Sequence, residues 1–481
     1  MKTVIPSFAK KILGKRLLFF AFLFLSVYQG SGQNMDLSFH SLAGTNNRLP
    51  FWLWANQLGR YTSENETIQN LEFNGNYNKA IGESAFRISS GVRLNLLLAN
   101  NNDVRFTELY GGLGWKSLQL NFGAFSDQER YEGLSTTNGN MASSRNARPH
   151  PKIRAGFNRF VPVNTWFSIY GFYEEGLLND NRYVENSHLH RKALYLRFGQ
   201  AASWQLTAGL EHFVMWGGTH PTYGELQEWE AYFDYVLGKA GGENALPTDK
   251  ANVAGNSYGT YQLEIKKEWN RFAATLYLSH PFDDKSGMEW DNYKDNLYGL
   301  YLTGKSERPL IKSLLLEYFH TKNQSGSTHL VPKPDGELHG RGLDNYYNHG
   351  VYRSGVTYHQ MAMVSPLFGP LNDSEGISMG FENTRFSGFH IGAIGFLTES
   401  IRWKTMLTYS NNFGQYKSGG LDTYQPSRKQ AMSLLELSWQ PYGKDLEFGA
   451  SVAADHGSLY DQGKSTTRLG AMLSVKWHIL K

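Results

Sequence analysis

An alternation of apolar and polar residues with a period of two recurs from about residue 66 to the C-terminus of this chain. Leu71, Phe73 and Tyr77 fall on one side of an extended strand, whereas Glu72 and Asn74 fall on the other. Beyond the N-terminal leader, the chain has no run of about 18 apolar residues, the length that a membrane-spanning helix requires. The alternation therefore predicts strands with one apolar and one polar face over most of the chain.

The N-terminus has the parts of a secretory signal peptide. Residues 1–16 contain five basic residues and no acidic ones. An apolar run of twelve residues, Leu17–Tyr28, follows, and small residues stand at Gly30, Ser31 and Gly32. We therefore predict a signal peptide at residues 1–32 and export from the cytoplasm.

Two-faced strands in an exported chain predict an all-β transmembrane antiparallel β-barrel, because lipid contacts only alternate residues of each strand. We place this barrel at residues 66–481. Residues 33–65 precede it and are predicted to pack in the lumen or to cap its periplasmic end. The candidate strands number about 18, an even number as in single-chain bacterial barrels. They are 66–81, 83–99, 104–117, 118–127, 152–163, 166–178, 189–199, 204–218, 257–269, 271–282, 296–305, 311–326, 376–387, 388–397, 401–416, 429–442, 444–461 and 468–480.

Composition agrees with a barrel and excludes several other classes. The mean hydropathy of −0.46 and the aromatic content of 14% suit a wall with a wet lumen and wet loops, although a soluble all-β protein is an alternative. The chain has no Cys, so it has no lipid-anchoring thiol, no disulfide and no thiolate ligand. Subtracting the leader's five charges from the formal +4 leaves about −1, which gives no support to a nucleic-acid partner.

The links between candidate strands alternate between short turns and long polar loops. In outer-membrane barrels the short turns lie on the periplasmic side and the long loops outside the cell. We therefore place residues 128–151, 219–256, 283–295 and 327–350 outside. Apolar residues recur at helical spacing over 225–237, which predicts a short helix that folds into the mouth as a plug.

The most distinctive local pattern is a pair of successive strands. LHRKALYLRFG occupies residues 189–199, and GLEHFVMWGG occupies residues 209–218. Together they resemble the paired-strand signature of the Wzi-like capsule assembly proteins, Bacteroidota type. This resemblance implies an outer-membrane barrel that binds capsular or other surface polysaccharide, assists its assembly or attachment, and has neither catalytic activity nor a cofactor. It implies surface polysaccharide and outer-membrane lipid as partners, with polysaccharide export machinery as a further one.

The residues themselves allow two interpretations of these strands. Glu211 and His212 are neighbours on a strand, so they point to opposite faces and cannot act on one ligand. Glu211 is predicted to face the lumen, and Trp216 to face lipid as a girdle residue or to bind ligand. Sugar binding needs aromatic faces for stacking, with polar groups beside them. The candidate ligand-binding residues are Glu211, Trp216, Trp229, Trp290, Arg341, Tyr346 and Tyr347, with Asp344 and His349 close by.

Two other functions are open to the same sequence. A porin or substrate-selective channel needs only a lumen that is not blocked. An outer-membrane hydrolase is suggested by His456 and Ser458, which lie two apart on one strand face, but the orienting third residue is not identifiable. The pair Asp283-Asp284 is interpreted as a solvated turn and the pair His188/His190 as structural. No metal-binding motif is present, so we predict no metal site.

Overall fold

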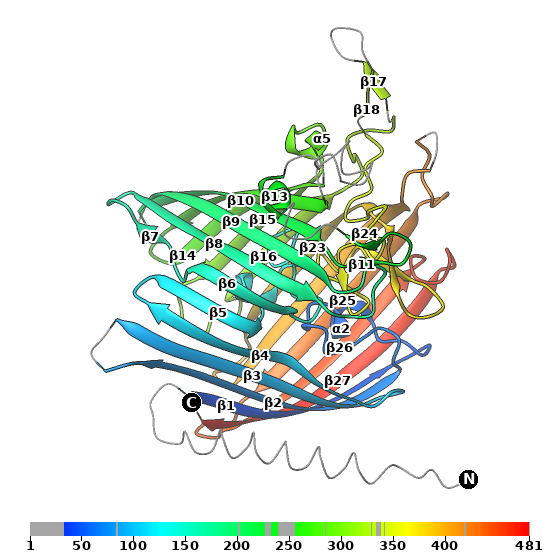
Figure 1. Cartoon of the computed structure of the whole chain (residues 1–481). Helices are drawn as coiled ribbons and strands as arrows, with labels where there is room; N and C mark the ends of the chain where they lie inside the picture. Colours follow the sequence, from blue (N-terminus) through cyan, green and yellow to red (C-terminus); the bar gives the residue numbers. More distant parts are fainter. Residues whose placement is uncertain are drawn as a thin grey trace, which may run out of the picture.

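The computed structural model describes residues 33–480 except 83–84, 201–202, 227–231, 239–254, 284, 329, 333–337, 341 and 418–419. Its main feature is one closed antiparallel sheet (Figure 1). The strands of this sheet are β1 (Gln33–Gly44), β2 (Thr67–Ala80), β3 (Phe86–Leu98), β4 (Asp103–Trp115), β5 (Leu118–Ala124), β6 (Pro151–Phe157), β7 (Val161–Pro162), β8 (Phe167–Leu178), β9 (Ser187–Gly199), β10 (Trp204–Trp216), β13 (Asn256–Glu268), β14 (Phe272–Phe282), β15 (Asn296–Gly304), β16 (Ser313–His320), β23 (Arg385–Phe396), β24 (Ile401–Gly414), β25 (Arg428–Trp439), β26 (Leu446–Gly457) and β27 (Thr466–Leu480).

The barrel closes where the first strand meets the last. β1 pairs with β2 on one side and with β27 on the other, both antiparallel. β6 and β7 both pair with β8 and follow one another along it, so the wall has 18 strand positions. The predicted transmembrane-type barrel of about 18 strands is confirmed.

Two assignments of individual strands differ from the prediction. Residues 33–44 are part of the wall as β1, so the barrel begins at Gln33 and not at residue 66. The predicted strand 376–387 is wrong. Residues Ser378–Asn383 form β22, which pairs with β21 (Gly369–Asn372) in a separate two-stranded sheet. Apolar and polar residues alternate in both β1 and β22, and only closure of the wall decides which of the two strands joins it.

Side chains alternate across the wall as the period of two requires. Leu473 on β27 is 63% exposed and faces outward, whereas its neighbour Ser474 is half-buried. Ser474 lies opposite His40 on β1, whose ring contacts the lumenal Tyr61. The apolar face of the strands is therefore the outer face.

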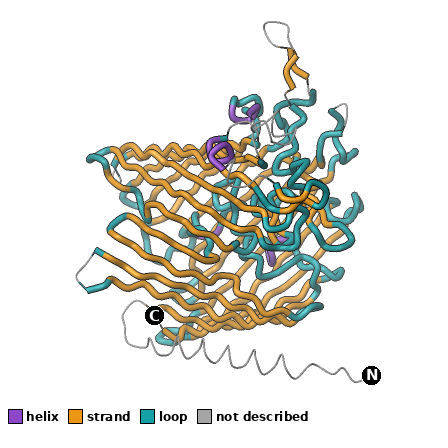
Figure 2. The backbone as a smooth tube through the Cα atoms, in the orientation of Figure 1, coloured by secondary structure: helices purple, strands orange, loops and turns teal. Residues whose placement is uncertain are grey.

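Short turns and long connections lie at opposite ends of the barrel (Figure 2). We call these the short-turn end and the long-loop end. Exposed tryptophans gather at the short-turn end, as an interfacial girdle does. They are Trp115, Trp166, Trp204, Trp269, Trp439 and Trp477. Among the described residues, no helix is long and apolar enough to cross a membrane.

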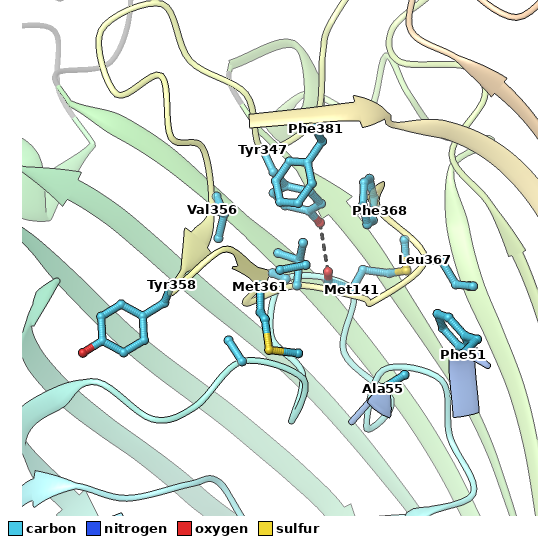
Figure 3. Packing of buried hydrophobic residues seen from close by; sticks show 14 of the residues in the cluster. Phe51, Ala55, Met141, Tyr347, Val356, Tyr358, Met361, Leu367, Phe368 and Phe381 are labelled. Carbon is cyan, nitrogen blue, oxygen red and sulfur yellow. Dashed lines mark hydrogen bonds between the residues drawn. The ribbon is translucent and has the colours of Figure 1, made fainter. Parts of the chain in front are cut away.

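The lumen is filled from the long-loop end by four connections, residues 45–66, 125–150, 179–186 and 344–384. Their apolar side chains form one buried cluster with the inner wall, which we call the lumenal core. Helix α2 (Phe51–Trp54) enters it, and Tyr347 donates a hydrogen bond to the Met141 carbonyl at 3.1 Å within it (Figure 3).

This core corrects two predictions about the loops. Residues 128–151 were predicted to be a long loop outside the cell, but this segment folds into the barrel, where residues 134–142 are buried except the half-buried Asn138. Part of the 225–237 segment is helical as predicted, as α3 (Tyr232–Leu237), but α3 does not enter the mouth. Of the two positions predicted for residues 33–65, the lumen is the one that residues 45–66 occupy. A plug made of loops was expected, and loop segments other than α3 supply it.

We expect Leu473→Arg to destabilise the barrel by about 2–4 kcal/mol, because the charge enters lipid near the middle of the strand. Ser474→Arg should cost far less, since its side chain enters the polar lumen. Denaturant titration of both variants in lipid vesicles measures the difference in their free energies of unfolding. Equal losses would mean that the two faces of β27 have been assigned wrongly.

Candidate functional site

The two motif strands are neighbours, and their side chains divide between lumen and outer face. β9 and β10 pair antiparallel along their full length. Arg191 and Glu211 point into the lumen, where Arg191 Nη2 lies 2.7 Å from Glu211. His212 points outward and its Nε2 lies 2.7 Å from Ser257 Oγ. The predicted lumenal position of Glu211 agrees with the structure, and Glu211 and His212 act on opposite sides of the wall.

Asp127 connects this lumenal pair to the loop that follows β5. Its two carboxylate oxygens contact Arg191 at 2.6 Å and Arg154 at 2.7 Å. Burial alone would raise the pKa of the Asp127 carboxyl, but the two guanidinium groups outweigh this effect and hold its pKa well below the usual range. Asp127 therefore remains a carboxylate and fixes the start of the loop to β6 and β9.

Glu317 on β16 holds the tip of the same loop. Its buried carboxylate accepts hydrogen bonds from Ser135 Oγ at 2.6 Å and from the Thr136 backbone N–H and Oγ1 at 2.9 and 2.8 Å. Tyr277 donates a further hydrogen bond at 2.6 Å. Four donors on one buried acidic side chain make the position of residues 135–136 well determined, because losing them would leave a buried carboxylate unsatisfied.

Trp216 lies on the outer face, as predicted, but it is not a girdle residue in contact with lipid. Its side chain is 0% exposed, because α3 packs over it on the outside of the wall. The Trp216 ring stacks on His188 at 4.4 Å and on Tyr235 at 5.8 Å. Tyr232 of α3 donates a hydrogen bond to Glu175 on β8 at 2.5 Å. Trp216 therefore has no surface for a ligand.

The prediction that Tyr346 and Tyr347 bind sugar from a loop tip is wrong. Both side chains are fully buried in the lumenal core. Tyr346 donates a hydrogen bond to Asp295 at 2.7 Å and accepts one from Asn292 at 2.6 Å. Burial, with the Asp295 carboxylate, raises the pKa of Tyr346. The loop that carries them looks polar in sequence but folds inward, where their rings pack against other apolar groups.

The other predicted residues have different positions. Trp290 is 45% exposed and stacks on His280 at 4.0 Å and on Tyr261 at 5.3 Å, both on the outer face of the wall. It lies where lipid meets the long-loop end, a position typical of an interfacial aromatic. Burial lowers the pKa of His349 to about 4, and its Nδ1 accepts from the Val351 and Tyr352 backbone N–H groups. Trp229 and Arg341 lie outside the described residues.

A group of rings that the sequence did not single out lies at the long-loop end, above the lumenal core. The Arg353 guanidinium lies 5.0 Å from the Tyr183 ring centre, Tyr183 meets His220 edge-on at 5.2 Å, and His220 stacks on Tyr223 at 4.4 Å. We call these three rings, together with the arginine beside them, the mouth rings. Tyr223 is 59% exposed and Arg353 is exposed. They come from three different loops, so no local pattern could have linked them.

The residues considered for other chemistry do not form a catalytic group. His456 Nδ1 pairs with Thr467 Oγ1 at 2.8 Å and not with Ser458. Asp283 accepts the Tyr347 backbone N–H at 3.3 Å, and Asp284 lies outside the described residues. Within the described part of the chain, no three His, Asp or Glu residues are arranged to hold a metal ion.

A closed antiparallel wall with an apolar outer face and a girdle of tryptophans defines an outer-membrane β-barrel protein. The family model for capsule assembly protein Wzi matches residues 22–380, about three quarters of the chain. The chain therefore belongs to this family, and the resemblance found in the motif strands is confirmed. It is a protein of the Gram-negative outer membrane. In such barrels the short turns face the periplasm, so the long-loop end faces outside.

The chain has low similarity to several solved structures. The Pseudomonas aeruginosa protein OprD has 10% sequence identity and a TM-score of 0.46, with 93% of this chain and 96% of that chain covered. Acinetobacter baumannii OccAB3 has 12% identity and a TM-score of 0.46, with 93% and 99% covered. No curated protein matches the chain.

We expect Glu317→Ala to loosen the loop around residues 133–142. Each hydrogen bond to a charged acceptor contributes about 1.5–3 kcal/mol, so losing several should speed amide exchange there by more than about tenfold. Hydrogen exchange read by mass spectrometry measures this change, with Glu307→Ala, an exposed residue in a short turn, as the control. Unchanged exchange in Glu317→Ala would mean that the loop is held by its other contacts.

Proposed function

We propose that this protein binds surface polysaccharide at the mouth of a plugged barrel and helps to hold it at the cell surface. Its membership in the capsule assembly family supports a role in capsule assembly. The structural observation that carries the finer proposal is the group of mouth rings. An exposed Tyr223 face and an exposed Arg353 lie at the end of the barrel that faces outside.

The mouth rings have the chemistry that a sugar chain requires. The apolar face of a pyranose stacks on an aromatic ring, and Tyr223 presents such a ring with His220 stacked behind it. The guanidinium of Arg353 donates hydrogen bonds in a plane and suits a carboxylate or a pair of hydroxyls. The four residues lie on three loops that pack on the lumenal core, so the site is supported from below.

The lumenal core argues against the alternative of an open channel. Side chains from α2, from the loop after β5 and from the long connection before β23 form one buried cluster with the inner wall. Asp127 and Glu317 fix that loop to the wall through short contacts. A solute would have to displace packed apolar groups as well as ion pairs to pass through.

The other functional predictions have less support. The His456–Ser458 contact that lipolysis would need does not form. We therefore propose a binding protein without a catalytic step. Contact with polysaccharide export machinery remains a prediction, because it rests on the capsule assembly role alone.

We expect the double variant Tyr223→Ala/Arg353→Gln to shed polysaccharide from cells while the barrel remains folded and abundant. Losing the stacked ring and the charged donor together should weaken polysaccharide binding by about 2–4 kcal/mol, or roughly 30- to 1000-fold. Cell-bound and shed polysaccharide are measured in the variant and the parent, with barrel abundance followed in parallel.

Trp290→Ala is the matched control for this experiment. It removes an exposed aromatic from the same end of the barrel but from the lipid side of the wall, so it should retain the polysaccharide. If the double variant keeps its polysaccharide as well as the parent, the mouth rings are not the site. If Trp290→Ala alone sheds it, the site lies on the outer rim.

The wild-type protein should pass little current in a planar bilayer, because the lumenal core blocks the pore. The measurement is the single-channel conductance of the purified barrel after insertion. A steady current comparable to that of an open eighteen-stranded porin would favour the channel function instead.

A further inference from the structure

A cavity of about 350 Å³ lies in the lumen below the loop that follows β5. Its lining includes residues near the short-turn ends of β8, β9 and β13, together with Arg159 and Phe160 from the turn after β6. We call this cavity the lower chamber. Its volume falls in the range of small-molecule sites. The mouth rings do not line it.

The lower chamber carries an excess of positive charge. Five arginines line it, Arg130, Arg154, Arg159, Arg191 and Arg197, against three carboxylates, Asp127, Glu211 and Glu264. Behind them Glu174 contacts both Arg154 and Lys152, which adds one charge of each sign and leaves the excess at two positive charges. Arg191 pairs with Glu211, Arg130 with Glu264 and Arg154 with Asp127, so these charges are balanced. The excess is therefore carried by Arg159 and Arg197, which form no ion pair with any described residue.

These two arginines have N–H groups that are not engaged in hydrogen bonds with described residues. Arg197 uses only Nε, which donates to Thr207 Oγ1 at 3.0 Å, and its guanidinium lies over the Phe160 ring at 3.5 Å. Its two terminal nitrogens have no hydrogen-bond partner within the described part of the chain. Arg159 is exposed beside it. Gln262 Nε2, also in the chamber lining, is a buried donor without a partner. A buried donor without a partner needs an acceptor, and a ligand oxygen in the chamber would serve Gln262 and the two arginines together.

One wall of the chamber is aromatic. Tyr170 lies 5.5 Å from Phe160, 6.2 Å from Phe172 and 5.9 Å from Tyr195, measured between ring centres. A simple inorganic anion would use the arginines but gain nothing from these rings. A ligand with a flat apolar face, several hydroxyls and one negative charge uses both.

We propose that the lower chamber binds a carboxylate-bearing sugar residue, such as a hexuronate, that enters from the periplasm. Arg197 binds the carboxylate through its two free nitrogens, and Arg159 adds a second charge at the entrance. Gln262 and Thr207 bind hydroxyls, and Tyr170 offers a ring for stacking. This site is separate from the mouth rings, and it implies that the protein meets acidic sugar on the periplasmic side of the plug as well as outside.

Calorimetric titration of the purified full-length barrel in detergent at low salt tests the proposal, with sodium glucuronate, glucose and sodium phosphate as probes. Glucuronate should bind, glucose should bind at least about tenfold more weakly, and Arg197→Gln should weaken glucuronate binding by a similar factor. Arg271→Gln, an exposed arginine in another periplasmic turn, is the matched control and should bind as the parent does. Arg159→Gln changes only a turn residue, so it provides a second variant if Arg197→Gln fails to fold.

Three results would overturn the proposal. They are glucuronate binding no tighter than glucose, equal glucuronate binding in the parent and in the arginine variants, and phosphate binding as tight as glucuronate, which would reduce the chamber to a general anion site. The polysaccharide retention assay on the mouth rings is independent of all three. Failure of either proposal therefore leaves the other standing.

Discussion

Closure of the wall is the constraint on which the rest of this structure depends. In lipid, an unpaired strand edge leaves backbone N–H and C=O groups without partners, and each costs several kcal/mol. β1 removes both edges by pairing with β2 and with β27. Once the sheet is closed, the period of two directs every second side chain into a lumen of fixed width. Whatever fills that lumen must then be compatible with its inner face.

The inner face is neither uniformly apolar nor uniformly polar, and its two ends differ in what they leave open to a ligand. Toward the outside, the inner wall supplies apolar residues such as Phe213 and Phe319, and the long loops fold inward over them to bury their own rings. Toward the periplasm, the inner wall carries arginines and carboxylates, which pair with one another and line the lower chamber. Asp127 and Glu317 mark the boundary, because they bind the loop at its two sides. The proposed binding surface at the outer end and the charged chamber toward the periplasm both follow from this division of the lumen.

Much of the wall could be predicted from the sequence, because its signal is local. All but one of the predicted strands coincide with wall strands, and the opposite directions of Glu211 and His212 follow from their adjacency alone. The errors lie where the pairing of strands far apart in the chain decides whether a segment joins the wall. β1 and β22 look alike as sequence, yet only β1 meets β27. The prediction of the site residues was wrong for a related reason. Tyr346 and Tyr347 sit in a polar stretch that resembles a surface loop, and nothing local indicates that it folds into a cavity built by strands far away in the chain.

The sequence by itself predicted the compartment and determined the fold class and which side chains of each strand face lipid, because a leader pattern and a period of two are properties of short segments. The tertiary structure alone decided what fills the lumen, which rings reach the surface and which arginines are left without a carboxylate. Tyr347 and Met141 stand 206 residues apart, and the mouth rings come from three separate loops. Such contacts depend on the shape of the closed barrel. That shape exists only after the two ends of the sheet have paired.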